Sequence, residues 1–592
     1  MSIVGIDLGT TNSLVSVFRN GKIEQIPNSF GEILTPSAVS FDEDGTVYVG
    51  KIAKERKITN PDTTVSSFKT FMGTNKKYNI YGKEYSPEEL SALVIKQLIS
   101  DAEKYLGEGV EEAVISVPAY FNNKQRNATK RAGVLAGIKV ERLINEPSAA
   151  AAYYYVNSAQ KQTFLVFDFG GGTLDISIVD AFENIIEVVA IVGDNHLGGD
   201  DFDNAIAKEI CRQNELEWNT LSSKDKEKIL KTAESCKFLL NVEQEVIVKT
   251  NIENKEIEGK ISKKRLIEIC ADIFTKIKRL LNRILKDSGI SSDEIDNILL
   301  VGGSSNMKVV QEYISYITHK NLLYDYQPDM LVGLGAGMVA GIKERKEELQ
   351  DIVMTDVCPF SLGTNIINRA NSNAEIFSPI IQRNTTLPVS RTRRYVTASE
   401  NQTELKFGVF QGENYYCSDN LKIGELTVNV PKGPEGREAA DVRFTYDING
   451  ILEVEVKVIS TGEVKKMYIQ SDDTNYTEEE MKKVMESLKE LKKDYMEDEK
   501  ILYVLEHGKR LYEENMGEMR EIIARAINSF EYAISTQDSF KIRKAYERTK
   551  EFFERIDSSS YGEVDFKDFI EEEDGEDGGD DLGDFTSRYT DE

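Results

Sequence analysis

Two short segments of this chain, 161 residues apart, share a β-like run, an aspartate and a turn rich in Gly and Thr. The first spans Ile3–Thr11 and the second Phe164–Thr173, and an apolar strand pattern follows each. Such hairpins bring backbone N–H groups close to an anion, and an aspartate at a strand end suits hydrated Mg²⁺. One segment alone is also explained by an ordinary β-turn. Two of them, each opening an α/β half, predict two related lobes that close on a nucleotide.

A third turn contains the same kinds of small residues. Gly302, Gly303 and Ser304 follow the buried strand pattern Leu299–Val301 and precede a helical pattern. Small residues there let a flat ring approach the backbone, although a plain strand-to-helix turn also explains the segment taken alone. The chain has no GxxxxGK[ST] motif, so the predicted phosphate site is not a P-loop.

The patterns along the chain divide it into modules. A chain of 592 residues is too long for one hydrophobic core. Strand and helix patterns alternate over 1–350 and predict an α/β domain, whereas β-rich segments over 357–471 predict a β module. Helical spacing over 472–560, starting at a capping box on Thr477, predicts a helical module, and residues 561–592 are predicted to be an acidic disordered tail.

The segment 351–356 between the first two modules is unusually apolar for a linker. Linkers are mostly polar, but Ile352, Val353 and Met354 are consecutive here. One interpretation is a further core strand. The other is an interdomain linker whose apolar residues dock with ATP and are released with ADP.

The net charge argues against two classes of binding partner, and the cysteine pattern argues against disulfides and a zinc site. The formal net charge of −28 argues against nonspecific binding to nucleic acid or to anionic membrane surfaces, because both are polyanions. Five widely spaced cysteines without a CxxC pair are typical of reduced thiols rather than of disulfides or a zinc site. With no long apolar run and no signal-like N-terminus, the sequence predicts a cytoplasmic protein.

Over about residues 1–560 the chain resembles the DnaK family of seventy-kilodalton heat-shock chaperones. The matching segments are GIDLGTTNS (5–13), ISVPAYFNNKQRNATKRAG (115–133), LINEPSAAA (143–151), FDFGGGTLDIS (167–177), VGDNHLGGDDFD (192–203), LLVGGSS (299–305), RNTTLPVSR (383–391) and FTYDINGILEV (444–454). The segments DVCPFSLG (356–363) and FSPIIQRNTT (377–386) look closest to the HscC-type subgroup. The resemblance implies a multidomain chain: an α/β two-lobed actin-like ATPase domain, a β-sandwich peptide-binding domain and an α-helical lid.

The resemblance also implies roles for residues of the ATPase domain. Catalysis falls to Lys69, Glu146, Asp168, Asp7 and Thr173, and Asp7, Asp168 and Asp175 would hold Mg²⁺ and K⁺ largely through water. The nucleotide would be held by Thr10, Thr11, Asn12, Gly171, Gly172, Thr173, Gly199, Glu234, Lys237, Phe238, Asn241, Gly302, Gly303, Ser304, Asn306 and Asp329. The plain alternatives are that Lys69 is a solvated lysine and Glu146 a carboxylate at a helix start.

Two positions depart from the family pattern at the adenine site. Family members generally sandwich the base between two arginines, whereas this chain has Phe238 and Asn306. Loss of two guanidinium planes predicts weaker stacking on adenine. Phe238 either stacks in place of one arginine or belongs to the core, and the sequence leaves both open.

In the β module the resemblance implies a pocket for an extended hydrophobic peptide. The matching positions are Ile366, Ile367, Tyr395, Ala398, Leu405 and Phe407. Leu405 and Phe407 alternate along a strand and so share one face, although sandwich core explains them too. Interdomain or cochaperone contacts are implied for Pro118, Arg126, Arg142, Asn145, Ile352, Val353 and Asp356.

The expected function is that of an ATP-dependent molecular chaperone with ATP or ADP, Mg²⁺ and K⁺ as ligands. Expected partners are unfolded client polypeptides and a J-domain cochaperone, with a nucleotide-exchange factor as a plausible addition and neither nucleic acid nor membrane. A sugar or metabolite kinase of the same ATPase superfamily shares the phosphate turns, but it leaves the apolar linker, the β module and the helical module unexplained. A nonenzymatic binder that uses nucleotide only structurally is the third class.

Overall fold

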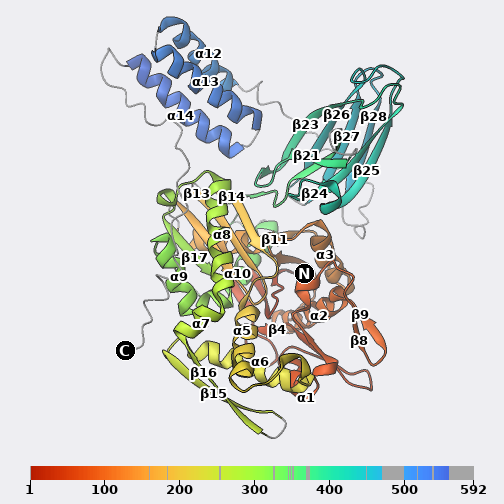
Figure 1. The fold of residues 1–592 in the computed structure, drawn as a ribbon, viewed down its shortest axis with the longest axis vertical. Coiled ribbons are helices and arrows are strands. Elements are labelled where there is room, and N and C mark those ends of the chain that lie inside the picture. Colours follow the sequence, from red (N-terminus) through yellow and green to blue (C-terminus); the bar gives the residue numbers. More distant parts are fainter. Residues whose placement is uncertain are drawn as a thin grey trace. The chain divides into compact units, whose positions relative to one another are not determined.

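The computed structural model describes the chain except residues 1, 159–160, 183–184, 253–254, 324–326, 345, 347–348, 350–351, 369–373, 448–449, 470–498, 517, 537–538 and 559–592. The chain divides into two compact units between Phe360 and Ser361 (Figure 1). The expected linker, apart from Asp351, which lies outside the described residues, therefore belongs to the first unit. The predicted capping box at Thr477 and the predicted acidic tail also lie outside the described residues.

The first half of the first unit is built on a sheet that carries the first phosphate turn. In spatial order its strands are β11 (Leu143–Asn145), β10 (Val110–Val117), β1 (Ser2–Asp7), β2 (Asn12–Arg19) and β3 (Lys22–Ile26), and β4 (Thr35–Pro36) also pairs with β2. β1 runs parallel to β10 and antiparallel to β2. The turn between β1 and β2 therefore holds the predicted phosphate-binding threonines, with Asp7 at the end of β1.

The second half repeats this plan. Its strands follow the order β18 (Leu322–Leu323), β17 (Asn297–Val301), β12 (Gln162–Phe169), β13 (Leu174–Phe182), β14 (Ile185–Asp194) and β19 (Val353–Val357). β12 pairs antiparallel with β13, so that Asp168 lies opposite Asp175, and it pairs parallel with β17. The second phosphate turn follows β12 and the Gly302 turn follows β17, so both turns lie at the same end of two neighbouring parallel strands.

Helices α4 (Glu146–Ser158) and α10 (Leu331–Lys343) cross closely because their contact surfaces are made of small residues. A Cβ atom on Gly335 of α10 would lie 1.9 Å from the carbonyl oxygen of Ala149 on α4. A Cβ atom on Gly5 of β1 would lie 2.1 Å from the backbone nitrogen of Gly337. Only glycine permits these approaches, which bring α10 against both the β1 strand and α4.

The remaining elements of this unit surround the two sheets. They are β5 (Ala38–Phe41), β6 (Val47–Val49), α1 (Lys51–Thr59), β7 (Thr64–Ser66), β8 (Tyr78–Ile80), β9 (Lys83–Tyr85), α2 (Pro87–Leu106), α3 (Asn123–Leu135), α5 (Gly199–Gln213), α6 (Ser223–Leu239), β15 (Glu245–Ile252), β16 (Lys255–Ser262), α7 (Lys263–Ile269), α8 (Ala271–Ser288) and α9 (Lys308–Thr318). A short 3₁₀ helix, Phe68–Phe71, follows β7 and carries Lys69.

The second unit contains a pair of four-stranded antiparallel sheets and a set of helices. One sheet has the order β21 (Ala374–Ile381), β20 (Leu362–Asn368), β24 (Glu404–Gln411) and β25 (Leu421–Asn429), and the other β23 (Val389–Val396), β26 (Ala439–Tyr446), β27 (Leu452–Val458) and β28 (Val464–Ile469). The helices are α12 (Glu499–Glu514), α13 (Glu518–Thr536) and α14 (Ser539–Ser558), which share a core that includes Val504, Phe530 and Phe553. The predicted order of α/β, β and α modules is confirmed. None of the helices in the described part of the chain is long and apolar enough to cross a membrane.

Candidate active site

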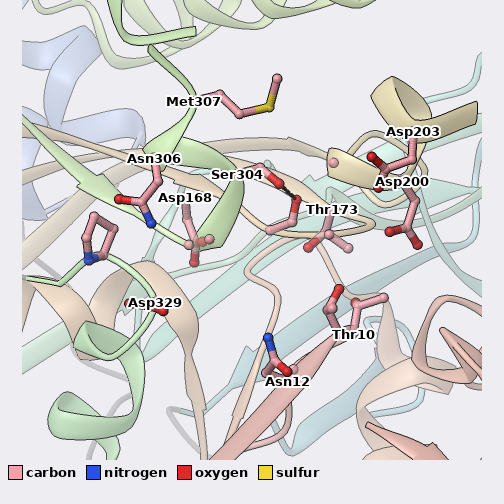
Figure 2. A pocket seen from close by; sticks show the side chains of 18 of the residues that line it. Thr10, Asn12, Asp168, Thr173, Asp200, Asp203, Ser304, Asn306, Met307 and Asp329 are labelled. Atoms are coloured by element: carbon pink, nitrogen blue, oxygen red, sulfur yellow. Dashed lines mark hydrogen bonds between the residues drawn. The ribbon is translucent and has the colours of Figure 1, made fainter. Parts of the chain in front are cut away.

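The two phosphate turns face each other at very short range. A Cβ atom on Gly171 would lie 2.0 Å from Thr11 Oγ1, and one on Gly172 would lie 3.1 Å from Thr10 Cγ2. Glycine is therefore required at Gly171 for the turns to approach. Ser304 adds the third turn, because its Oγ donates a hydrogen bond of 2.8 Å to the carbonyl oxygen of Gly170 (Figure 2).

A cavity of about 310 Å³ lies between these turns (Figure 2). The sequence-predicted residues that line it are Asp7, Thr10, Thr11, Asn12, Lys69, Glu146, Asp168, Gly171, Thr173, Gly199, Glu234, Lys237, Phe238, Asn241, Gly302, Gly303, Ser304, Asn306 and Asp329. Gly172 and Asp175 are not among the lining residues. Sequence reasoning missed Lys54, Asp200, Asp203, Met307, Pro328 and Val332.

Lys69 and Glu146 form a buried ion pair at one end of this cavity. Lys69 Nζ lies 2.6 Å from Glu146 Oε1, and the residues are 3% and 7% exposed. Lys69 is therefore not a solvated lysine. Glu146 does begin helix α4, as the plain alternative proposed, but its carboxylate also holds the lysine. The pair places one cation and one carboxylate beside the phosphate turns.

Three aspartates near this pair have unfavourable surroundings for a negative charge. Burial, and then repulsion from Glu146, raise the pKa of Asp7 to about 7 and hold the pKa of Asp168 well above its usual range. Asp168 Oδ2 is buried without a hydrogen-bond partner among the described residues. Crowded carboxylates with a free oxygen fit a hydrated divalent cation, since a cation relieves their repulsion.

Asp175 has a different environment from the other two aspartates. Its carboxylate accepts hydrogen bonds from the backbone N–H groups of Ala119 and Tyr120, each at 3.2 Å. Burial raises its pKa to about 7. Among the described residues, no three His, Cys, Asp or Glu side chains are grouped to ligate a metal directly. The predicted K⁺ role of Asp175 stays a prediction.

The predicted adenine residues also line this cavity. Phe238 is 55% exposed, so it is not a core residue and its ring is available for stacking. Lys237 Nζ lies 2.7 Å from Asp203 Oδ2 and 5.7 Å from the Phe238 ring centroid. Asn241 Oδ1 accepts a hydrogen bond from the Lys308 backbone at 2.9 Å. These residues offer an aromatic face and amides, without a second ring or a guanidinium plane among the described lining residues.

Most of the expected linker forms strand β19, next to β14 in the second sheet. It pairs parallel with β14, with Val353 opposite Ile185 and Met354 opposite Ile186. Ile352 and Met354 pack against the hydrophobic core, whereas Val353 is 53% exposed. The sequence predicts that Ile352, Val353 and Met354 all dock, but the period-two alternation of a strand turns Val353 away from the face that Ile352 and Met354 share.

Asp356, at the end of this segment, is linked to the start of α4. Asn145 Nδ2 donates a hydrogen bond of 2.6 Å to Asp356 Oδ2, and Arg126 donates to both Asn145 Oδ1 and the carbonyl oxygen of Ala119, which follows Pro118. Burial lowers the pKa of Arg142, and the Asp356 carboxylate partly restores it. Asn145 immediately precedes Glu146, so the linker strand and the Lys69 ion pair share one backbone segment.

A family model described as Hsp70 protein matches residues 3–562, nearly the whole chain. The chain belongs to the Hsp70 family. Proteins of this family are chaperones and ATPases that bind ATP or ADP with Mg²⁺, and they typically interact with client polypeptides and cochaperones. The two-lobed α/β unit, the β-sandwich and the helices are the multidomain arrangement of an Hsp70 protein.

The predicted peptide positions of this Hsp70 protein fall into two environments. Leu405 and Phe407 are buried on one face of β24, and the Phe407 ring lies 5.7 Å from that of Tyr395. Tyr395 and Ser378 share a hydrogen bond of 3.1 Å between their hydroxyl oxygens. Ile366 and Ile367 are consecutive on β20 and so point to opposite faces, and Ile367 is 48% exposed. Ala398 is partly buried.

Proposed function

We propose that this Hsp70 protein binds and releases extended hydrophobic segments of client polypeptides under the control of ATP binding and hydrolysis. The observation that carries the proposal is the shared backbone segment of Asn145 and Glu146. Asn145 holds Asp356 within the linker strand, while Glu146 holds Lys69 in the cavity. A change at the phosphates that moves Glu146 therefore acts directly on the residue that holds the linker.

Hydrolysis depends on positioning and on charge. Phosphoryl transfer to water has little covalent chemistry for the protein to supply. Lys69 and the backbone N–H groups of the two turns stabilise the charge that develops on the phosphate oxygens, and Glu146 orients the attacking water. Asp7 and Asp168 would hold Mg²⁺ through its water ligands, and the ion supplies charge neutralisation when it is bound. We also propose K⁺ as a second cation.

Coupling between nucleotide and peptide then follows from the linker. Docking of Ile352 and Met354 on the α/β unit is favourable with ATP, and their release with ADP tightens the hold on the client. A J-domain cochaperone that contacts Arg142, Asn145 and Asp356 would act on this connection and stimulate hydrolysis. We also propose that a nucleotide-exchange factor interacts with this protein and that the protein belongs to the HscC-type subgroup.

The test is the steady-state ATPase rate with and without a short hydrophobic peptide. The proposal predicts turnover of ATP without phosphorylation of any small molecule, and a rate that changes when peptide is added. A product that is a phosphorylated metabolite supports the kinase alternative. Nucleotide binding without turnover in a single-turnover assay supports the nonenzymatic binder and contradicts the proposal.

A further inference from the structure

Ser67 stands at the start of the segment that carries Lys69. It precedes the 3₁₀ helix Phe68–Phe71 and has a left-handed backbone with a φ of 53°, which is uncommon for a residue with a side chain. Its carbonyl oxygen accepts a hydrogen bond of 2.8 Å from Thr70 Oγ1. Phe68 is fully buried beside it. The conformation of Ser67 therefore sets where this short helix, and Lys69 within it, begins.

The side chain of Ser67 reaches across to the second half of the unit. Its Oγ donates a hydrogen bond of 3.0 Å to Asp200 Oδ2 at the start of α5. The backbone N–H of Asp200 donates a hydrogen bond of 2.8 Å to the carbonyl oxygen of Gly171. Asp200 thus holds the Lys69 segment with its side chain and the second phosphate turn with its backbone. Figure 2 shows Asp200 and Thr173 around the same cavity.

Other polar contacts of Lys69 do not duplicate this connection. The ion pair with Glu146 joins two residues of the first half, since Glu146 belongs to the segment that follows β11. Asp200 and Gly171 belong to the second half. The hydrogen bond between Ser67 and Asp200 therefore ties the backbone that positions Lys69 to the turn that faces it.

We propose that Ser67 and Asp200 form a latch across the nucleotide cavity, in which Asp200 is a positioning residue that fixes Lys69 relative to the second phosphate turn. The latch rests on the proposed ATPase function. Closing the two halves on a nucleotide makes the hydrogen bond, and the bond in turn holds Lys69 at the phosphate. Ser67 and Asp200 contribute to the rate of the chemical step more than to nucleotide affinity.

The experiment is a double-mutant cycle with Ser67→Ala, Asp200→Asn and the double variant, measured by single-turnover ATP hydrolysis and by nucleotide affinity. Each single variant is expected to slow hydrolysis about tenfold, as expected for losing a hydrogen bond to a charged group, while affinity changes less than threefold. The double variant is expected to be no slower than the worse single variant, because both changes remove one interaction. Ser67→Asn, which keeps a hydrogen-bond donor and tolerates the left-handed backbone, is expected to retain most of the rate. If the slowing factors of the two single variants multiply in the double variant, the two residues act independently and the latch is contradicted.

Ser235→Ala is the matched control. Ser235 lines a neighbouring cavity of about 490 Å³ that Ser67 and Asp200 also line, but its hydroxyl donates to Lys231 of its own helix, so its loss is expected to leave hydrolysis unchanged.

A second measurement tests the latch without hydrolysis. All five cysteines are buried, so Ile52→Cys on α1 and Lys224→Cys on α6 allow selective labelling and a distance measurement across the halves. ATP is expected to shorten this distance less in Ser67→Ala than in the parent. If ATP shortens the distance equally in the parent and in Ser67→Ala, the latch is contradicted even where hydrolysis is normal. If the parent does not hydrolyse ATP, the proposed function alone is contradicted.

Discussion

Lys69 Nζ lies 2.6 Å from Glu146 Oε1 in a nearly solvent-free part of the cavity. The two residues come from sequence positions 77 apart, one on a short 3₁₀ helix and one at the first turn of α4. The desolvation cost of an ion pair buried this deeply can exceed its Coulombic gain, so stability alone does not account for the pair. Its position beside two facing phosphate turns supports the proposed role in hydrolysis, which the predictions below test.

Lys69→Ala is expected to slow single-turnover ATP hydrolysis by about a hundredfold or more, because one charge that stabilises the transition state is lost. Nucleotide binding stays measurable, because the phosphate turns remain. Lys51→Ala removes an exposed lysine that pairs with Glu32, and it is the control expected to keep the parent rate. A Lys69→Ala variant that hydrolyses ATP at the parent rate contradicts the assignment.

The buried carboxyl group of Asp203 is expected to make the free energy of unfolding depend on pH, and an Asp203→Asn variant isolates this contribution. Burial raises its pKa to about 6 despite the nearby Lys237. A carboxyl group whose pKa is raised on folding stabilises the native state at low pH, and this contribution is lost as pH rises through the folded pKa. The difference in unfolding free energy between the parent and Asp203→Asn should therefore fall by about 1–3 kcal/mol between pH 4 and pH 7. Thermal unfolding of the nucleotide-free chain measures it, and a difference that is constant or rises with pH counts against this environment.

Arginines introduced at the predicted adenine site are expected to increase the affinity for nucleotide. Phe238→Arg with Asn306→Arg is expected to tighten ADP binding by about 1–2 kcal/mol if both guanidinium planes stack on the base. Phe238→Ala alone is expected to weaken binding, because the exposed ring is the only aromatic face among the described lining residues of this cavity. Calorimetry gives both values. An unchanged affinity in the double variant shows that these positions do not face the base.

The α/β, β and α order could be predicted from sequence because strand and helix periodicity are local signals. The repeated turns were informative for the same reason, since Asp7 and Asp168 sit at equivalent places in two similar segments. Most lining residues came from the family resemblance rather than from spacing. Asp175 shows the limit, because its hydrogen bonds to the backbone of Ala119 and Tyr120 depend on a contact that no local pattern records.

Asp200 and Val353 show two further reasons why the sequence predictions differ from the structure. Asp200 matters through one hydrogen bond to Ser67, 133 positions away, and nothing in its local sequence separates it from the adjacent Asp201. Val353 was expected to dock with Ile352 and Met354, but strand alternation puts Ile352 and Met354 on one face and Val353 on the other, where it is 53% exposed. Treating the segment as a uniform apolar run hid that alternation.

The central claim is that ATP controls peptide release through the docked linker strand. Ile352→Asp with Met354→Asp should abolish docking, because burying unpaired carboxylates costs several kcal/mol, about 2–7 kcal/mol even for uncharged polar groups. Val353→Asp is the matched control, since this neighbour is 53% exposed and its carboxylate stays in water. All three proteins are expected to bind nucleotide and peptide separately.

The direct measurement is the rate of peptide dissociation with and without ATP in the parent, the Ile352→Asp/Met354→Asp variant and Val353→Asp. We predict that ATP accelerates dissociation in the parent and in Val353→Asp but has no effect in the double variant. If ATP accelerates release equally in all three proteins, the strand is a passive part of the sheet and the coupling mechanism is wrong.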